Sequence, residues 1–163
     1  SRIGKTKYTV LRHSNIYGPD DKFDLEKSHV CGATITKVLS SEKKGEIKVW
    51  GTGEEERDLL YVDDLVYSVE LAIKKQKTSF GLFNVGYGKS ISINKLVKKI
   101  IFHSGLNVEI KHDKTQPTIK TSLSLNCSKI KKHLGWKRSI SHDEGLKRTI
   151  TWWRKNFETS KTG

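Results

Sequence analysis

This sequence of 163 residues has only two cysteines, Cys31 and Cys127, and they lie far apart. Neither belongs to a Cys-x-x-Cys pair or has histidines at the spacing of metal ligands, so no structural zinc site is expected. The apolar runs span only a few residues, against the roughly 20 that cross a bilayer, and no apolar segment follows the basic N-terminus. We therefore expect a cytoplasmic protein in a reducing compartment, without a bound metal, a secretory signal or a membrane contact.

Two patterns of dinucleotide-dependent enzymes are also missing. The sequence has no glycine-rich turn to hold a dinucleotide pyrophosphate and no Tyr-x-x-x-Lys pair to move protons. Gly86-Tyr87-Gly88-Lys89-Ser90 looks like the end of a phosphate-binding P-loop, but Phe83 stands where that motif needs its first glycine. The chain also begins without methionine, which indicates trimming or an internal fragment. We therefore expect part of a catalyst, and no nucleotide hydrolase.

The charge is strongly one-sided, because 31 lysines and arginines against 18 aspartates and glutamates give a net charge of +13. Such an excess attracts phosphates of any kind. Three interpretations are open: a solvated basic surface, cations that hold the diphosphate of a ligand, and nucleic-acid binding. The lysines lie mostly in pairs along the whole chain, which favours the first. No zinc finger or RNP-like aromatic motif supports the third, so no nucleic-acid partner is expected.

Short β-prone runs alternate with helical patterns along the chain. We predict strands near residues 8–12, 47–50, 58–62, 80–85 and 108–110, and helices over residues 29–40, 63–73, 92–104, 128–134 and 141–157. This alternation predicts an α/β fold with parallel strand pairing. Because the strands are few and short for a self-contained doubly wound sheet, some are expected to belong to a sheet that lies outside this chain.

Several helix ends carry local signals. A helix is expected to begin near Ser92 and to end before Gly105, and Ser141-x-x-Glu144 forms a capping box for the last helix. Asp63 and Asp64 are predicted to cap the helix that follows them. Apolar residues recur in this helix with a period of 3.6 residues and are predicted to form its buried side: Leu65, Val66, Val69, Ala72 and Ile73.

Six motifs follow one another over nearly the whole chain. They are N-x-Y-G-P at residues 15–19, W-G-T-G-x-x-x-R-D at 50–58, Y-V-D-D at 61–64, F-N-V-G-x-G at 83–88, S-K-I-K-K-H-L-G-W at 128–136, and E-G-L-x-x-T-I-x-W-W at 144–153. In this order they resemble the C-terminal half of the extended short-chain dehydrogenases, the NAD-dependent epimerase/dehydratase family. Within that family, residues 18–23 and the His29-Val30 pair are most similar to the GDP-L-fucose synthases.

The resemblance implies a fold and an activity. Residues 1–163 would form the C-terminal, substrate-binding part of a Rossmann-type protein, and the strands near 8–12 and 80–85 would join the sheet of a missing N-terminal half. NADP would bind mostly in that half. The implied reaction is the epimerisation and reduction of a GDP-keto-deoxy-sugar by a full-length homodimer, and the isolated chain would be inactive. The alternative is a non-catalytic module that binds a nucleotide-sugar or a protein.

The resemblance also implies roles for five residues. His29 would act as an acid in the epimerisation, and Asn15 would lie close to the substrate or the nicotinamide. Arg57 would bind the substrate diphosphate, Lys37 would be a basic substrate-binding residue, and Trp50 would pack beside the nucleotide. The residues themselves leave other interpretations open: an exposed loop histidine, a surface lysine and a core tryptophan.

The sequence departs from the GDP-L-fucose synthases near the expected diphosphate. Residues 116–119 stand where those enzymes have a Lys-Pro-Asp-Gly signature, and Ser122 replaces a basic residue that follows it. If the chain binds a diphosphate, Lys114 or Lys120 would have to supply the missing charge.

Overall fold

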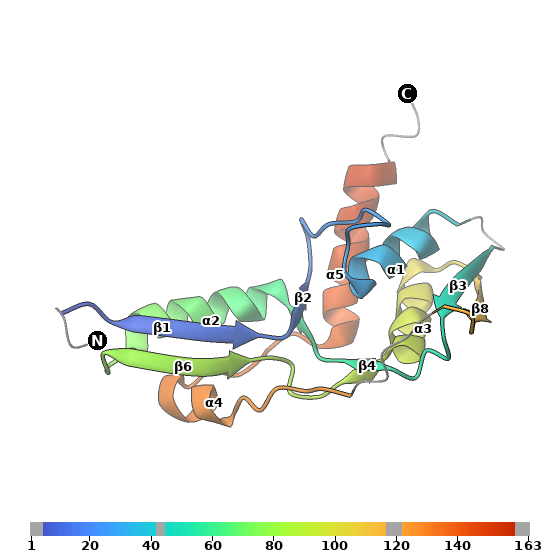
Figure 1. Ribbon diagram of the computed structural model, residues 1–163. Helices are drawn as coiled ribbons and strands as arrows, with labels where there is room; N and C mark the ends of the chain where they lie inside the picture. Colours follow the sequence, from blue (N-terminus) through green and yellow to red (C-terminus); the bar gives the residue numbers. More distant parts are fainter. Residues whose placement is uncertain (1–4, 42–44, 117–121, 159–163) are drawn as a thin grey trace.

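The chain forms an α/β fold in which short strands alternate with helices (Figure 1). The computed structural model describes residues 5–41, 45–116 and 122–158. Its elements in chain order are β1 (Tyr8–His13), β2 (Asn15–Tyr17), α1 (Val30–Leu39), β3 (Glu46–Trp50), β4 (Glu56–Arg57), β5 (Leu59–Tyr61), α2 (Val62–Lys75), β6 (Phe80–Val85), β7 (Ile91–Ser92), α3 (Ile93–Ser104), β8 (Glu109–Asp113), α4 (Ser128–Leu134), α5 (His142–Trp153) and the π-helical turn η1 (Arg154–Glu158).

The strands pair two by two, and mostly in parallel. The pairs β1–β6, β2–β5 and β3–β8 are parallel, and β4–β7 is antiparallel. In Figure 1, β1 and β6 run side by side in front of α2, while α1, α3, β3 and β8 lie at the opposite end of the molecule. The predicted α/β class and the parallel pairing are confirmed. Asn15 begins β2, a short strand that lies outside the predicted strand ranges.

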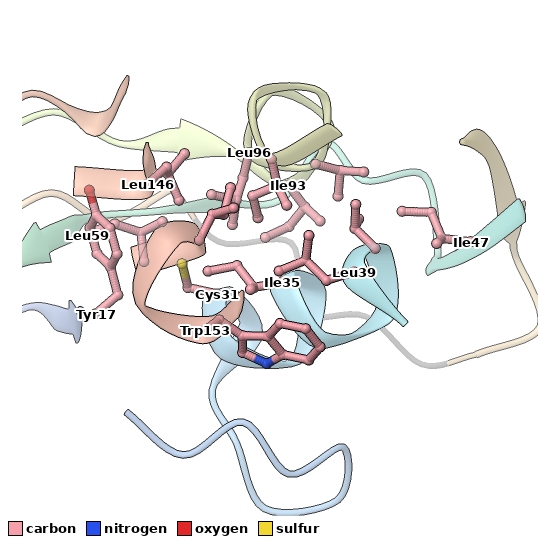
Figure 2. Close-up of a cluster of buried hydrophobic side chains, with 14 of the residues drawn as sticks. Tyr17, Cys31, Ile35, Leu39, Ile47, Leu59, Ile93, Leu96, Leu146 and Trp153 are labelled. Atoms are coloured by element: carbon pink, nitrogen blue, oxygen red, sulfur yellow. The ribbon is translucent and has the colours of Figure 1, made fainter. Parts of the chain in front are cut away.

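Two hydrophobic clusters hold these elements together. The larger joins α1, α3 and α5, which contribute the fully buried side chains of Ile35, Leu96 and Leu146 (Figure 2). The smaller lies between β6, α2 and α4 and contains Ile130 and Trp136. Each fully buried aliphatic side chain of this size contributes about 1.5–3 kcal/mol, so the first cluster fixes α1 relative to the rest of the chain.

The local helix signals are mostly confirmed. The Ser92 hydroxyl accepts the backbone N–H of Lys95, and α3 ends at Gly105, whose φ of 67° lies in the left-handed region. The Ser141 hydroxyl accepts the backbone N–H of Glu144 at the start of α5. These signals work because each depends on residues within one helical turn.

The predicted cap of α2 is wrong. The helix already begins at Val62, so Asp63 and Asp64 lie inside its first turn. Asp64 is buried, and its carboxylate accepts the backbone N–H groups of Ser139 and Ile140 at 2.7 and 3.1 Å. A residue that looked like a local cap therefore joins α2 to the segment before α5.

The predicted buried face of α2 is also largely wrong. Val66, Val69 and Ile73 are 51%, 43% and 80% exposed. Of the predicted face, Ala72 is buried and Leu65 is partly buried, and the helix also buries Ser68 and Leu71, which lie toward another side. Sequence periodicity detects an apolar stripe, but only the packing partner decides which stripe is covered. On α2 the covered side faces the rest of this chain, whereas Val66, Val69 and Ile73 face outward.

No helix in the described ranges is long and apolar enough to span a membrane.

Candidate functional site

One cavity lies where β2, the β4–β5 segment and the chain before α4 meet. Its volume is about 810 Å³. Its walls are formed by residues 13–21, 29, 56–58, 62 and 123–125. We call it the larger cavity.

A second cavity of about 450 Å³ lies between α1, β3 and the start of α3. Its walls are formed by residues 25, 26, 28, 30, 33, 34, 37, 47–50, 55, 57, 93 and 97. We call it the smaller cavity. Helix α1 therefore contributes to this cavity, and the residue just before it, His29, contributes to the larger one.

The five predicted site residues divide between the two cavities. Asn15 and His29 line the larger cavity, and Lys37 and Trp50 line the smaller one. Arg57 lines both. Of the five, Arg57 is thus the residue that the two cavities share.

Two residues of the larger cavity are held by backbone contacts. The N–H of Asn15 donates to the carbonyl of Asp58 at 3.1 Å, which fixes the start of β2 beside β5. His29 is the N-cap residue of α1, and its carbonyl accepts the N–H of Ala33. Its imidazole makes no capping bond and is exposed. The side chain is therefore accessible at the edge of the cavity.

The smaller cavity has an exposed aromatic wall. Trp50 ends β3 and is 55% exposed, so the interpretation of this residue as a core tryptophan is wrong. The Lys37 ammonium lies 5.9 Å from the centre of its ring, within the range of a cation–π contact. An accessible indole beside a cation can stack on a planar ring that carries or adjoins negative charge.

Arg57 sits on β4, which pairs with β7 in antiparallel register. Its Nη1 donates to the carbonyl of Glu56 at 2.9 Å. A guanidinium has five N–H groups in a planar fork that matches two oxygens of a phosphate, so this partly buried side chain suits a diphosphate better than a lysine would.

Asp58 is the residue of the site that sequence reasoning missed. The residue is 4% exposed, and its carboxylate accepts the backbone N–H groups of Tyr87, Gly88 and Leu125, at 2.7, 3.1 and 2.9 Å. The turn that resembled a P-loop is thus an anion cradle whose ligand is the chain's own carboxylate. The only available signal was the position of Asp58 directly after Arg57, within W-G-T-G-x-x-x-R-D.

Tyr87, in the same turn, is packed between two side chains. Its ring stacks on His142, with centroids 3.7 Å apart and planes 17° apart, and the Arg138 guanidinium lies 3.7 Å from the same centroid. At these distances the two groups cannot share one face, so the ring lies between them. Burial lowers the pKa of His142, whose Nε2 lies 3.1 Å from the carbonyl of Leu59.

Carboxylates are frequent in the larger cavity. Its wall contains Asp20, Asp21, Glu56 and Asp58, whereas Arg57 is the only lysine or arginine among the described residues that line it. Oε2 of Glu56 accepts hydrogen bonds from the hydroxyls of Ser90 and Ser122, each at 2.5 Å.

The residues that could supply positive charge near a diphosphate are only partly within the described ranges. Residues 117–119 of the altered signature and Lys120 lie outside the described residues. Lys114 follows β8 and lines neither cavity. Ser122, at the position of the replaced basic residue, binds the Glu56 carboxylate. Within the described ranges, no cluster of three or more histidine, cysteine, aspartate or glutamate side chains could hold a metal ion.

Comparison with known sequences gives one family and a consistent set of relatives. Residues 1–86 match the model of the NAD dependent epimerase/dehydratase family. The chain is 31% identical to GDP-L-fucose synthase 1 of Arabidopsis thaliana over 145 residues, which cover 88% of this chain and 44% of that protein. It is 28% identical to GDP-L-fucose synthase of Escherichia coli (91% and 49%) and 30% identical to UDP-glucuronate 4-epimerase of Thermodesulfobacterium geofontis (94% and 45%). The chain thus spans about half the length of these relatives.

Solved structures show the same likeness. UDP-glucose 4-epimerase from Thermotoga maritima, determined with UDP-glucose, superposes with a TM-score of 0.81 at 34% identity, over 91% of this chain and 46% of that one. UDP-N-acetylglucosamine 4-epimerase from Methanobrevibacter ruminantium also superposes with a TM-score of 0.81, at 26% identity, over 93% and 47%. The fold of the chain therefore matches about half of such a protein.

Proposed function

Because the chain belongs to the NAD-dependent epimerase/dehydratase family, we propose that it is the substrate-binding portion of an NAD(P)-dependent nucleotide-sugar epimerase or reductase. The finer proposal is a GDP-L-fucose synthase-like reaction, the epimerisation and reduction of a GDP-keto-deoxy-sugar. One observation carries the proposal: Arg57 lines both cavities, of which the smaller also contains Trp50 and the larger also contains His29.

A nucleotide-sugar fits this arrangement from end to end. The base would stack on Trp50 near Lys37, the diphosphate would bind the Arg57 fork, and the sugar would enter the larger cavity. Asn15 and His29 would then flank the sugar. Relatives named for GDP-sugar and UDP-sugar reactions support a nucleotide-sugar, and the subfamily resemblance favours GDP.

His29 is the proposed acid. Epimerisation next to a carbonyl exchanges protons on carbon, and an imidazole both donates and accepts protons near neutral pH. His29 is exposed at the edge of the larger cavity, so its side chain is accessible to a bound sugar.

The proposed cofactor is NADP, which supplies the hydride when it is bound. The residues of this chain fit only its reacting end, where Asn15 faces the larger cavity. The glycine-rich turn at residues 86–88 cannot hold the pyrophosphate, because the N–H groups of Tyr87 and Gly88 already bind the Asp58 carboxylate. Residues outside this chain would therefore hold most of the cofactor, and the isolated chain is expected to have no reductase activity.

The strand pair β1–β6 also indicates that residues outside this chain complete the protein's fold. Parallel sheets are normally covered on both faces, yet Tyr8, Val10 and Phe80 of this pair are 44–55% exposed. We propose that β1 and β6 join a Rossmann-type sheet formed by residues outside the chain. A homodimer of the full-length protein stays a prediction. So does a cytoplasmic location, which the two free buried thiols support.

Titration calorimetry of the chain with GDP, UDP and their hexose conjugates tests the proposal. We expect binding, and a loss of about tenfold in affinity for Arg57→Ala, since a charge-assisted hydrogen bond typically contributes this much. Arg148→Ala, a cation outside both cavities, is the matched control and should bind normally. If no nucleotide binds, or if both variants bind as the wild type does, the proposal is wrong. A non-catalytic binding module would show the same binding, and an upstream reading frame without a Rossmann sequence would identify it.

A further inference from the structure

The carboxylate of Glu56 is held in place by two serines from different parts of the chain. Ser90 precedes β7 and Ser122 lies in the segment before α4, and both hydroxyls donate to Oε2 at 2.5 Å. These hydrogen bonds, first that of Ser122 and then that of Ser90, lower the pKa of Glu56. Glu56 is also one of the residues that line the larger cavity, so this anchored carboxylate places a negative charge at the wall of that cavity at neutral pH.

This charge stands in an acidic wall of a basic protein. The chain carries a net charge of +13, yet the described wall of the larger cavity has four carboxylates and, apart from His13 and His29, only Arg57 as a basic residue. Over the whole chain, by contrast, lysines and arginines outnumber aspartates and glutamates, 31 to 18. The larger cavity is thus set apart electrostatically from the surface around it.

The smaller cavity has the opposite balance. Lys37, Lys48 and Arg57 line it, against Glu26 and Glu55. An asymmetric ligand would accordingly place its anionic part at Arg57 and the smaller cavity, and an uncharged part in the larger one.

We propose that Glu56 is a specificity-determining residue that makes the larger cavity accept an uncharged, hydroxyl-bearing sugar and reject a sugar that carries a carboxylate. The inference rests on the proposed function and names its substrate class. Sugar hydroxyls can donate to a carboxylate, whereas a second carboxylate nearby is repelled in a cavity partly shielded from water. The choice is a real one in this family, since its members are named for UDP-glucose and for UDP-glucuronate.

The test compares two ligands that differ only in this charge. UDP-glucose has a hydroxymethyl group where UDP-glucuronate has a carboxylate. We expect the chain to bind UDP-glucose about tenfold more tightly, a size typical of one unfavourable charge pair near a protein surface. In Glu56→Gln the ratio of the two dissociation constants should fall to about two, because the amide keeps the shape and an oxygen acceptor for the serines. If the chain prefers guanine, GDP-mannose and GDP-mannuronate are the equivalent pair.

The ratio within one protein is insensitive to a general loss of stability. Glu55→Gln removes the same charge from the neighbouring residue, which lines the smaller cavity, and should leave the ratio unchanged. Equal binding of the two sugars by the wild type, or an unchanged ratio in Glu56→Gln, would overturn the inference and leave the proposed function standing. If the wild-type chain also failed to bind UDP and GDP, both this inference and the proposed function would be overturned.

Discussion

The carboxylate of Asp58 accepts the backbone N–H of Tyr87 at 2.7 Å, and this bond joins β5 to the turn that leaves β6. A second segment, at Leu125, donates to the same carboxylate. Since Arg57 is the preceding residue, the position of the proposed phosphate-binding side chain depends on an internal anion.

Removal of the Asp58 carboxylate should lower the stability of the protein, and a small added carboxylate should restore part of that stability. Asp58→Ala would remove the shared acceptor of three partly buried N–H groups, so we expect the free energy of unfolding to fall by about 2–4 kcal/mol. Formate is small enough to occupy the vacated cradle and should restore part of this loss, increasingly with its concentration. Urea denaturation with sodium formate, compared with sodium chloride at equal ionic strength, measures the effect.

The matched control is Asp143→Ala, which removes an exposed carboxylate that pairs with Lys99 and His103. Its stability should respond equally to formate and chloride. A wild-type stability in Asp58→Ala, or equal responses of this variant to the two salts, would show that the cradle does not need its anion.

Acidification should weaken the fold through His142. Burial lowers the pKa of this histidine, so the folded state favours the neutral ring. The unfolded state binds more protons, and stability present above the ordinary pKa near 6.5 is lost as the pH falls through it toward the folded value. Protonation would also place a second cation on the Tyr87 ring, on the face opposite Arg138.

Urea denaturation at pH 7.5 and 5.5 tests this prediction. The loss of stability between the two values should be smaller in His142→Gln than in the wild type. In His133→Gln, which changes an exposed histidine, it should equal the wild-type loss. Carboxylates whose pKa is lowered, such as Asp143 and Glu144, affect stability only at pH values below the range from 5.5 to 7.5. The same pH dependence in all three proteins would contradict the assignment.

Trp50 should report nucleotide binding directly. Of the four tryptophans, it is the one whose ring is exposed on a cavity wall, so a stacked base should quench its fluorescence. We expect Trp50→Leu to abolish the quenching and to weaken GDP or UDP binding about five- to tenfold. Stability should hardly change, because the side chain is exposed. Phe102→Leu, an exposed aromatic outside both cavities, should leave both signals unchanged. Quenching that persists in Trp50→Leu would place the base elsewhere.

Sequence reasoning succeeded where the determining contacts are local. The Ser92 cap, the Gly105 end and the Ser141 cap each involve residues a few positions apart, and all three are confirmed, although the Glu144 carboxylate of the predicted capping box binds Arg148. The division of Asn15, Lys37 and Arg57 between two cavities depends on the tertiary fold and could not be read from spacing.

Asp58 and Asp64 show why the remaining features were missed or misread. The partners of the Asp58 carboxylate lie 29, 30 and 67 positions away, and those of Asp64 lie 75 or 76 positions away. No local pattern distinguishes such a buried anchor from an ordinary capping or surface aspartate. Sequence alone therefore assigned Asp64 to the nearest helix end.

The outward stripe of α2 yields the last prediction. Val66, Val69 and Ile73 share one helix face and are largely exposed. A helix that is apolar on two sides is normally buried on both, so we expect the isolated chain to self-associate through this face as its concentration rises. Ile73→Lys should shift sedimentation velocity profiles toward the monomer, and should not lower the free energy of unfolding because this side chain is 80% exposed.

Phe102→Lys is the control, because Phe102 is 79% exposed but belongs to α3. If Phe102→Lys has the same effect, general charge rather than the α2 face governs association. A wild-type chain that stays monomeric at every concentration would contradict the prediction. If residues outside the chain complete the sheet of β1 and β6, a longer protein that contains them should protect the amides of α2 and the two strands from hydrogen exchange more than the isolated chain does.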